Sequence, residues 1–265
     1  MANFAFVRYR MDLSYNGAAF CGWQIQPGAP TVQGELEGAL GTLLHSTVGV
    51  IGAGRTDTGV HALHYVAHFE YEGPLDCPQL RYKLNAILPK GISIASVSPS
   101  GPDFHARFSA ISRSYSYYLH RAKNPFLEDR SYYYGYPDVD FDLMNRCASL
   151  LLGRHDFSCF EKSGGDNKTS ICTVTKALWE PYEPAFAAAP GNCWRFSIEA
   201  DRFLRNMVRA IVGTILEVGR GKRTAENFSS LILPVDEVLE QSGSRRSNAG
   251  ESVPAHALFL TDVKY

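Results

Sequence analysis

Hydrophobic and polar residues alternate at the start of the chain, between Phe4 and Tyr15. Such alternation is typical of a strand with one buried face, so we predict that the chain opens with a strand. After Thr31, which can cap a helix, four leucines between positions 36 and 44 form one apolar stripe. β-branched and aromatic residues then predict two strands with a helix between them, at 64–72, 78–87 and 92–98. The predicted order is therefore β-α-β-α-β.

A second series of elements begins near Phe104. The residue pattern predicts, in order, a strand at 114–118, a helix at 144–152, strands at 172–180 and 193–200, and a helix at 203–218. Gly153 and Gly219 follow the two helices directly, at the position where glycine commonly ends a helix. The chain therefore resembles two similar α+β halves, 1–103 and 104–265, joined without a flexible linker.

Composition limits the class of protein without indicating an activity. Of the 265 residues, 45% are hydrophobic and 20% are charged, as in an ordinary soluble globular protein. The sequence has no long apolar run of the kind that spans a membrane, and its N-terminus lacks the apolar core of a signal peptide. The six cysteines are scattered without a C-x-x-C pair. We therefore expect reduced thiols in a cytoplasmic protein, with neither a disulfide framework nor a zinc site.

Charge is distributed unevenly along the chain. The net charge is −1, but 104–123 contains four Lys/Arg and no Asp/Glu, and 195–223 contains seven Lys/Arg against three Asp/Glu. Each segment is therefore +4, and the remainder of the chain carries −9. Such segregation predicts a basic surface that suits a polyanion such as a nucleic acid. Charge runs are also common on ordinary solvated surfaces, which leaves that alternative open.

The segment 52–62 is the strongest candidate for chemistry. It contains three glycines within eight residues, which allow tight turns and close approach of the backbone to a ligand. Arg55 and Asp57 stand two residues apart, between two predicted strands, where their side chains can project from a loop. A carboxylate beside a guanidinium stays ionised at neutral pH, as a nucleophile must. The alternative is a structural turn in which Asp57 only caps backbone amides and pairs with Arg55.

The segment resembles the signature Gly-Arg-Thr-Asp-x-Gly-Val-His-Ala of the tRNA pseudouridine synthase A (TruA) family. Six further stretches of the chain match the family in the same order: 15–24, 31–37, 84–89, 104–110, 155–160 and 203–213. The chain departs from the family pattern at Asn16, where aspartate is usual, and at Ala257, where glycine is usual. Neither departure involves Asp57, but the second one lies next to Leu258.

The resemblance implies a role for each matching residue. Asp57 corresponds to the aspartate that attacks the nucleoside, and Arg55 to a residue that helps to open the RNA stem and displace the target base. Tyr115 corresponds to the tyrosine that stacks on the target uracil. Arg209 corresponds to the basic residue that pairs with the aspartate, and Leu258 to an aliphatic contact with the base.

The basic residues near Arg209 are further candidates. Arg205 and Arg209 are four residues apart, so on one helical stripe they could hold phosphate and Asp57, respectively. Arg202 and Lys222 lie in the same basic segment and are candidate contacts with the RNA backbone.

The resemblance also implies a fold and a function. The two halves are expected to share an extended, mainly antiparallel mixed sheet with helices packed outside, and an active-site cleft between them. The expected protein is a cytoplasmic isomerase and homodimer, which converts uridine to pseudouridine at positions 38 to 40 of the tRNA anticodon arm. This isomerisation involves no redox change and no external group, so no cofactor, metal or nucleotide is expected.

Three other classes of protein compete with this interpretation. A metalloenzyme could use His61, His64 and His68, but a strand would place His61 on the opposite face from the other two. A glycoside hydrolase needs a second carboxylic acid, and the motifs supply only one. A non-catalytic α+β RNA-binding protein fits the aromatic strand at 114–118, but it has no use for an Arg-Thr-Asp loop. Turnover by an Asp57→Asn variant separates an enzyme from a binding protein.

Overall fold

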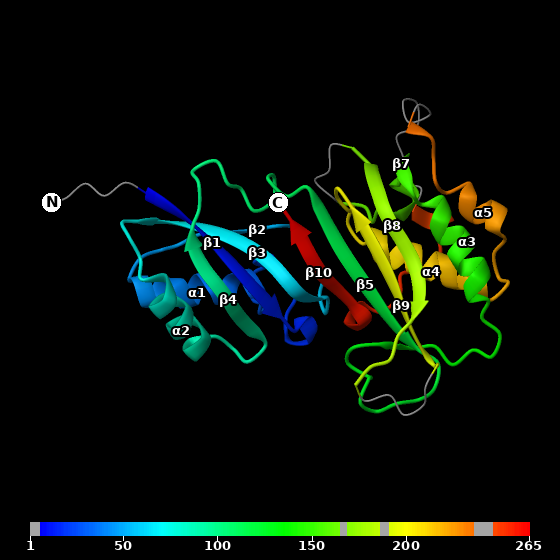
Figure 1. Cartoon of the computed structure of the whole chain (residues 1–265), viewed down its shortest axis with the longest axis horizontal. Helices are drawn as coiled ribbons and strands as arrows, with labels where there is room; N and C mark the ends of the chain where they lie inside the picture. Colours follow the sequence, from blue (N-terminus) through cyan, green and yellow to red (C-terminus); the bar gives the residue numbers. More distant parts are fainter. Residues whose placement is uncertain (1–5, 165–168, 186–190, 236–245) are drawn as a thin grey trace. The chain divides into compact units, whose positions relative to one another are not determined.

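The computed structural model describes residues 6–164, 169–185, 191–235 and 246–265. The chain divides into two compact units. The first unit contains the chain up to Ile111 together with Phe259–Tyr265, and the second unit is Ser112–Leu258. Each unit combines a sheet with helices (Figure 1), so the predicted α+β class is confirmed. Most of the strand pairs are antiparallel, as predicted.

The sheet of the first unit has the strand order β4-β1-β3-β10, and β2 also pairs with β3. Its strands are β1 (Phe6–Tyr15), β2 (Val50–Gly52), β3 (His61–Glu72), β4 (Ile92–Pro99) and β10 (Leu258–Lys264). The helices α1 (Val32–Leu44) and α2 (Cys77–Ile87) lie together on one face of this sheet (Figure 1). Alternate residues of β1 are buried against that face: Tyr9, Met11, Leu13 and Tyr15. The residues between them, which are polar, face the opposite side.

The first helix forms for the reasons that the sequence predicts. The side chain of Thr31 accepts a hydrogen bond from the Gly34 N–H, 3.2 Å away, and so caps the N-terminus of α1. Leu36 and Leu40 of the predicted stripe are completely buried. The predicted opening strand is also confirmed from Phe6 onward, whereas Phe4 lies outside the described residues.

The sheet of the second unit has the order β5-β9-β8-β7, with antiparallel neighbours throughout. Its strands are β5 (Ser112–His120), β6 (Tyr132–Tyr133), β7 (Gly153–Asp156), β8 (Ile171–Pro181) and β9 (Cys193–Ala200), with β6 parallel to β5. Its helices are α3 (Phe141–Leu150), α4 (Met207–Gly219) and α5 (Ala225–Ser229). Nearly every residue of α4 is buried, so this helix forms the centre of the unit.

Two predicted helix boundaries are wrong. The helix predicted at 203–218 begins only at Met207, because Asn206 has a φ of 64° and cannot continue a right-handed helix backwards. Arg205 therefore precedes the helix and does not share a helical stripe with Arg209. The helix predicted at 144–152 ends at Leu150, and Leu152 is 44% exposed instead of completing its buried stripe.

The division into units differs from the predicted boundary between residues 103 and 104. The segment after Phe104 belongs to the first unit because the Ala106 N–H donates to the His68 ring, and the Ile111 N–H donates to the Lys264 carbonyl. The last strand also joins the first unit, since β10 runs parallel to β3 with Phe259 opposite His61. Hydrophobic periodicity shows that a strand forms, but not which sheet it joins.

Two further findings concern the class of the protein. The structure shows no disulfide among the six cysteines, all of which lie within the described residues. Among the described residues, no helix combines the length and the apolar character that crossing a membrane requires.

Candidate active site

Asp57 lies in the loop that connects β2 with β3 in the first unit. Exposure changes from residue to residue along this loop. Arg55 is exposed, Thr56 is buried with 8% of its surface accessible, and Asp57 is half-buried. Because the Thr56 side chain points into the unit, its two charged neighbours reach the surface. The loop therefore presents a carboxylate and a guanidinium from a fixed backbone, as the sequence predicts.

Three hydrogen bonds hold the backbone around Asp57. The Thr56 hydroxyl lies 2.9 Å from the Tyr15 hydroxyl, in a buried contact. The Trp23 N–H donates to the Thr56 carbonyl at 3.2 Å, and the Val60 N–H donates to the Asp57 carbonyl at 3.1 Å. The peptide groups before and after the Asp57 side chain are thus both fixed. A carboxylate held in this way loses little freedom on binding a substrate.

Two glycines make the tight path of the loop possible. The bond from Val60 to Asp57 closes a four-residue turn, and its third residue, Gly59, has a φ of 81°. A positive φ at that turn position favours glycine strongly. Gly22 also has a positive φ, of 87°, and a Cβ there would lie 2.5 Å from the Thr56 carbonyl oxygen. A side chain at Gly22 would therefore separate Trp23 from the loop.

Three buried aromatic rings support the loop from below. Trp23 and Tyr65 stack with centroids 4.2 Å apart, and Tyr15 contacts Tyr65 edge-on at 5.5 Å. All three side chains are at most 4% exposed. A Cβ on Gly52 would lie 2.1 Å from the Tyr65 hydroxyl oxygen, so the start of the loop is pressed against these rings. Close packing of this kind resists displacement of the loop.

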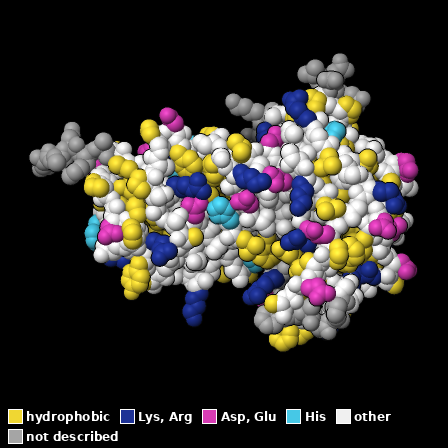
Figure 2. Space-filling model, viewed as in Figure 1, with side chains coloured by type: hydrophobic (Ala, Val, Ile, Leu, Met, Phe, Trp, Pro, Cys, Tyr) yellow, Lys and Arg dark blue, Asp and Glu magenta, His cyan; other side chains and the backbone are white. Residues whose placement is uncertain are grey.

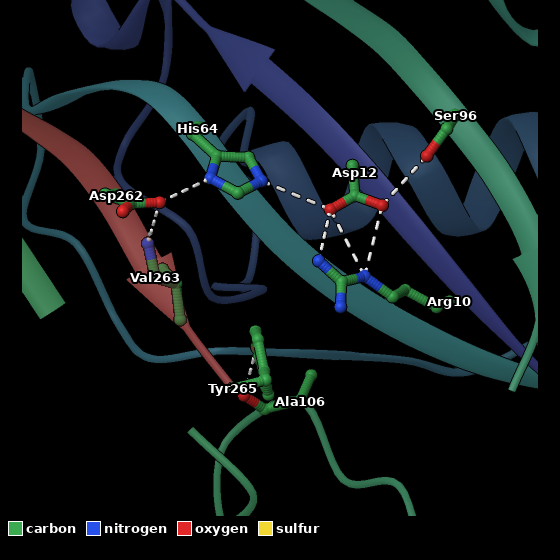
Figure 3. Close-up of polar contacts among 8 residues, drawn as sticks. All are labelled: Arg10, Asp12, His64, Ser96, Ala106, Asp262, Val263 and Tyr265. Atoms are coloured by element: carbon green, nitrogen blue, oxygen red, sulfur yellow. Dashed lines mark hydrogen bonds and ion pairs between the residues drawn. The ribbon is translucent and has the colours of Figure 1, made fainter. Parts of the chain in front are cut away.

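The open face of the same sheet carries a polar row across four strands (Figure 3). The Asp12 carboxylate accepts hydrogen bonds from Arg10 at 2.7 Å and from the Ser96 hydroxyl at 2.8 Å. His64 lies between two carboxylates, with Nδ1 2.8 Å from Asp262 and Nε2 3.2 Å from Asp12. Burial lowers the pKa of His64, but the bonds to Asp262 and Asp12 outweigh it and raise that pKa. This row links β10 to the rest of the sheet.

The histidines of β3 are each engaged in separate contacts. His61 accepts a hydrogen bond from the Gly17 N–H, His64 joins the polar row, and His68 accepts from the Ala106 N–H. Among the described residues, no group of three His, Cys, Asp or Glu side chains is arranged to hold a metal ion. The three histidines therefore form no common site.

Tyr115 lies on β5 in the second unit, opposite Ile198 of β9. Its ring is half-buried and meets the Phe203 ring nearly at right angles, with centroids 5.1 Å apart. The neighbouring Ser114 points to the other face of the strand, where its hydroxyl donates to Glu199. Phe203 therefore orients an aromatic ring that is still accessible to a ligand.

Arg209 lies on α4 and is fastened to the segment that leads to the C-terminal strand. Its Nε donates to the Val253 carbonyl at 2.8 Å, and the Val253 N–H donates back to the Arg209 carbonyl at 3.3 Å. The Tyr117 hydroxyl donates to the next carbonyl, that of Pro254, at 3.1 Å. Burial raises the pKa of Tyr117 well above its ordinary value, so the hydroxyl remains a donor. Further along the segment, Leu258 is buried, with 5% of its surface exposed.

The other basic candidates also belong to the second unit. Arg202 is half-buried, and Lys222 is exposed just beyond α4. Arg205 is exposed, and its guanidinium donates to the carbonyls of Ser163 and Gly164 at 3.1 and 3.3 Å. On the face of the molecule in Figure 2, basic side chains are interspersed with acidic ones, so this face does not form the single basic surface predicted from the sequence.

The structure thus brings Arg55 and Asp57 together on one loop of the first unit. The remaining predicted site residues all lie in the second unit: Tyr115, Arg202, Arg205, Arg209, Lys222 and Leu258. Sequence reasoning missed the residues that anchor the loop, namely Tyr15, Trp23 and Thr56. Tyr15 and Trp23 stand within the matched stretch 15–24, which was the only signal that could have indicated them.

The chain is similar to known proteins over nearly its whole length. A family model described as "tRNA pseudouridine synthase" matches residues 13–109 and 147–265. The tRNA pseudouridine synthase A of Parabacteroides distasonis is 46% identical over 260 residues, which cover 97% of this chain and 96% of the relative. The enzyme of the same name from Bacteroides thetaiotaomicron is 48% identical and covers 97% and 90% of the two chains. That of Porphyromonas gingivalis is 46% identical and covers 97% of each.

Proposed function

This chain belongs to the tRNA pseudouridine synthase family and isomerises uridine to pseudouridine in tRNA; we propose that Asp57 is its catalytic carboxylate. The observation that supports this role is the position of Asp57 on a loop whose backbone is hydrogen-bonded on both sides of the side chain. The loop lies within the part of the chain that the family model matches.

The reaction makes clear demands on a carboxylate. The bond between C1′ of the ribose and N1 of uracil breaks, the base rotates, and C1′ then bonds to C5. C5 loses its proton and N1 gains one, so the product is an isomer of uridine and no group is added from outside. An ionised carboxylate can attack C1′ as it develops positive charge, attack C6 of the base, or remove a proton. Each of these steps requires the carboxylate of Asp57 to be charged and fixed in position.

The second unit supplies the remaining parts of the proposed mechanism. A uridine must leave its helical stack to react, and a flipped base regains about 1–3 kcal/mol by stacking on an aromatic ring. Tyr115 is suited to this role because its ring is accessible and is oriented by Phe203. Arg209 is proposed to pair with Asp57 during the reaction, and the buried Leu258 to contact the apolar face of the base.

The contact with RNA is proposed to involve the other cationic side chains. Arg55 is exposed next to Asp57 and could enter the RNA stem when the target base leaves it. Arg202, Arg205 and Lys222 are candidates for phosphates, which attract Arg and Lys regardless of base sequence. Backbone contacts of this kind position the tRNA, while the flipped base itself is recognised beside Asp57.

The substrate is tRNA, and its target is proposed to be the anticodon arm, at positions 38 to 40. The resemblance to the TruA family supports this choice of target. It also supports two further proposals, that the enzyme is a homodimer and that it acts in the cytoplasm. Sedimentation of the purified chain tests the dimer directly, since a monomer and a dimer of a 29.3 kDa chain separate clearly.

Tritium release tests the proposed target. The enzyme is mixed with tRNA that carries [5-³H]uridine, and with matched tRNAs in which the uridines at positions 38 to 40 are replaced by cytidine. Release is expected only while at least one of these uridines is present. Undiminished release from a tRNA without them would show that the target lies elsewhere in the molecule.

A further inference from the structure

His61 lies at the junction between the Asp57 loop and β3, and it is almost completely buried, with 2% of its surface exposed. Its Nδ1 accepts a hydrogen bond from the Gly17 N–H at 3.1 Å. Its ring stacks on Phe259 of β10, with centroids 4.4 Å apart and planes inclined by 17°. One side chain thus links the end of the loop to two other segments of the first unit.

The contact with Gly17 holds two stretches of backbone very close together. Gly17 begins the short helix η1 (Gly17–Ala19), and a Cβ on Gly17 would lie 2.0 Å from the Val60 carbonyl oxygen. Only a hydrogen atom fits in that space. The bond from the Gly17 N–H to the His61 ring satisfies a buried donor at the same point, and leaving it unsatisfied would favour separation of the two segments.

The junction is coupled to Asp57 by a rigid link. Only three residues separate Asp57 from His61, and the bond between the Val60 N–H and the Asp57 carbonyl closes them into a turn. A shift of the backbone at His61 must therefore move Asp57 as well. Displacement of a reacting group by about 1 Å can cost a factor of about 10² in rate.

We propose that His61 is a positioning residue, which sets the position of the Asp57 carboxylate through the hydrogen bond between its Nδ1 and the Gly17 N–H. His61 does not itself touch the substrate. This inference rests on the proposed catalytic role of Asp57, and it names the contact that makes that role possible.

The chain contains a matched control for this contact. His68 lies on the same strand, is also 2% exposed, and its Nδ1 also accepts a backbone N–H, that of Ala106, at 3.1 Å. The two histidines therefore have the same burial and the same hydrogen-bond chemistry. His68, however, holds the segment around Ala106 and has no contact with the Asp57 loop among the interactions described.

Two substitutions separate the hydrogen bond from the ring. In His61→Asn, the amide oxygen can take the place of Nδ1 and accept from Gly17, but the stacking on Phe259 is lost. In His61→Phe, the ring still stacks on Phe259, but no acceptor remains. The same pair of changes at His68 provides the control. For each full-length variant, kcat and KM for tRNA are measured by tritium release, and the melting temperature is recorded.

The expected result is a selective loss of kcat. His61→Phe should lower kcat by about 30-fold or more while KM stays within about 3-fold, and His61→Asn should retain kcat within about 5-fold. His68→Phe should lower the melting temperature as much as His61→Phe but keep kcat within about 2-fold. Normal kcat in a folded His61→Phe variant, or equal losses of kcat in His61→Phe and His68→Phe, would overturn the proposal.

Two further variants keep the outcome decisive. If His61→Phe does not fold, His61→Gln replaces it. The amide of glutamine reaches the place of Nε2 instead of Nδ1, so it cannot accept the hydrogen bond from Gly17. Activity in His61→Gln but not in His61→Asn would contradict the proposal. Asp57→Asn distinguishes the two levels of inference. If Asp57→Asn is active, the proposed catalytic role of Asp57 is wrong. If Asp57→Asn is inactive but His61→Phe is fully active, only the proposed role of His61 is wrong.

Discussion

The hydroxyl groups of Tyr15 and Thr56 lie 2.9 Å apart in the interior of the first unit, and Thr56 immediately precedes Asp57. The two residues are 41 positions apart in the sequence, and one comes from β1 while the other comes from the loop that carries Asp57. The contact therefore ties the position of the carboxylate to the central sheet. Under the proposed catalytic role of Asp57, this contact should influence both the stability of the fold and the rate of the reaction.

Removal of the Tyr15 hydroxyl should have both effects. Tyr15→Phe leaves the buried Thr56 hydroxyl without this partner, which should lower the free energy of unfolding by about 1–3 kcal/mol. Urea unfolding measures this loss, and tritium release measures kcat. Tyr9→Phe is the control, since the Tyr9 hydroxyl is equally buried but donates to the Gly73 carbonyl, away from the loop. A kcat that falls equally in both variants would show that the loss of rate is not specific to the Asp57 loop.

Arg209 should be sensitive even to replacement by lysine. Its Nε is fixed on the Val253 carbonyl, and lysine has no donor at that position and no planar fork for a carboxylate. We expect Arg209→Lys to lower kcat/KM by about 10-fold or more. Arg81→Lys is a suitable control because Arg81 also donates to a backbone carbonyl, that of Ala95, but lies on α2. Wild-type kinetics in Arg209→Lys would make Arg209 an ordinary helix residue.

His68 should make the protein less stable as the pH falls. Burial, with smaller effects from His105 and Arg8, lowers the pKa of His68 from 6.5 to about 4. The folded state therefore favours the neutral ring, and its contribution is complete above about pH 6.5. It is lost between about pH 6.5 and 4, at up to about 1.4 kcal/mol per pH unit. Urea unfolding of His68→Asn, which accepts the same N–H but does not titrate, should show a shallower pH dependence over that range; an unchanged dependence would contradict this assignment.

His64 should have the opposite dependence. Its pKa is raised, because the bonds to Asp262 and Asp12 outweigh the effect of burial. The charged ring therefore stabilises the folded state fully below about pH 6.5, and this contribution is lost as the pH rises through the folded pKa. His64→Asn should remove that loss from the urea unfolding curves above pH 6.5. If His64→Asn and the wild type lose stability in parallel there, the polar row in Figure 3 has no electrostatic role.

Binding of tRNA should depend steeply on salt if Arg202 and Lys222 contact phosphates. Each phosphate contact contributes a slope of about −0.7 to −0.9 to log K against log[salt]. Arg202→Gln and Lys222→Gln should each reduce the slope by about one unit for every tRNA, without changing which uridine is modified. Lys83→Gln, at an exposed lysine of α2, should leave the slope unchanged. An affinity that is insensitive to salt would rule out binding through phosphates.

Local sequence signals predicted most individual elements. Thr31 with its following leucines gave α1 because a cap and an apolar stripe act within one helix. The same reasoning placed Arg205 on α4 and was wrong, because Asn206 has a positive φ, which the apolar periodicity of the sequence does not indicate. The last strand was predicted to belong to the second half, but it pairs with β3 of the first unit. Hydrophobic periodicity carries no information about which strand Phe259 pairs with.

The residues of the candidate site also fall into two groups, those that the local sequence predicts and those whose contacts form only in the folded unit. Asp57 and Arg55 could be predicted because the glycine-rich loop and the charged pair occupy one short stretch of sequence. Tyr15 and Trp23 could not be assigned as anchors of the loop, because their contacts with Thr56 form only when β1 and the loop meet in the folded unit. His61 was considered as a metal ligand, whereas its ring in fact accepts from Gly17.

The most direct test of the central claim compares Asp57→Asn with the wild type. The substitution removes the charge but preserves the size of a half-buried side chain, so folding and tRNA affinity should be retained. Tritium release from [5-³H]uridine tRNA should fall by at least about 10³-fold, while tRNA binding and the melting temperature stay close to those of the wild type. Release at about a tenth of the wild-type rate or more would show that Asp57 is not the catalytic carboxylate.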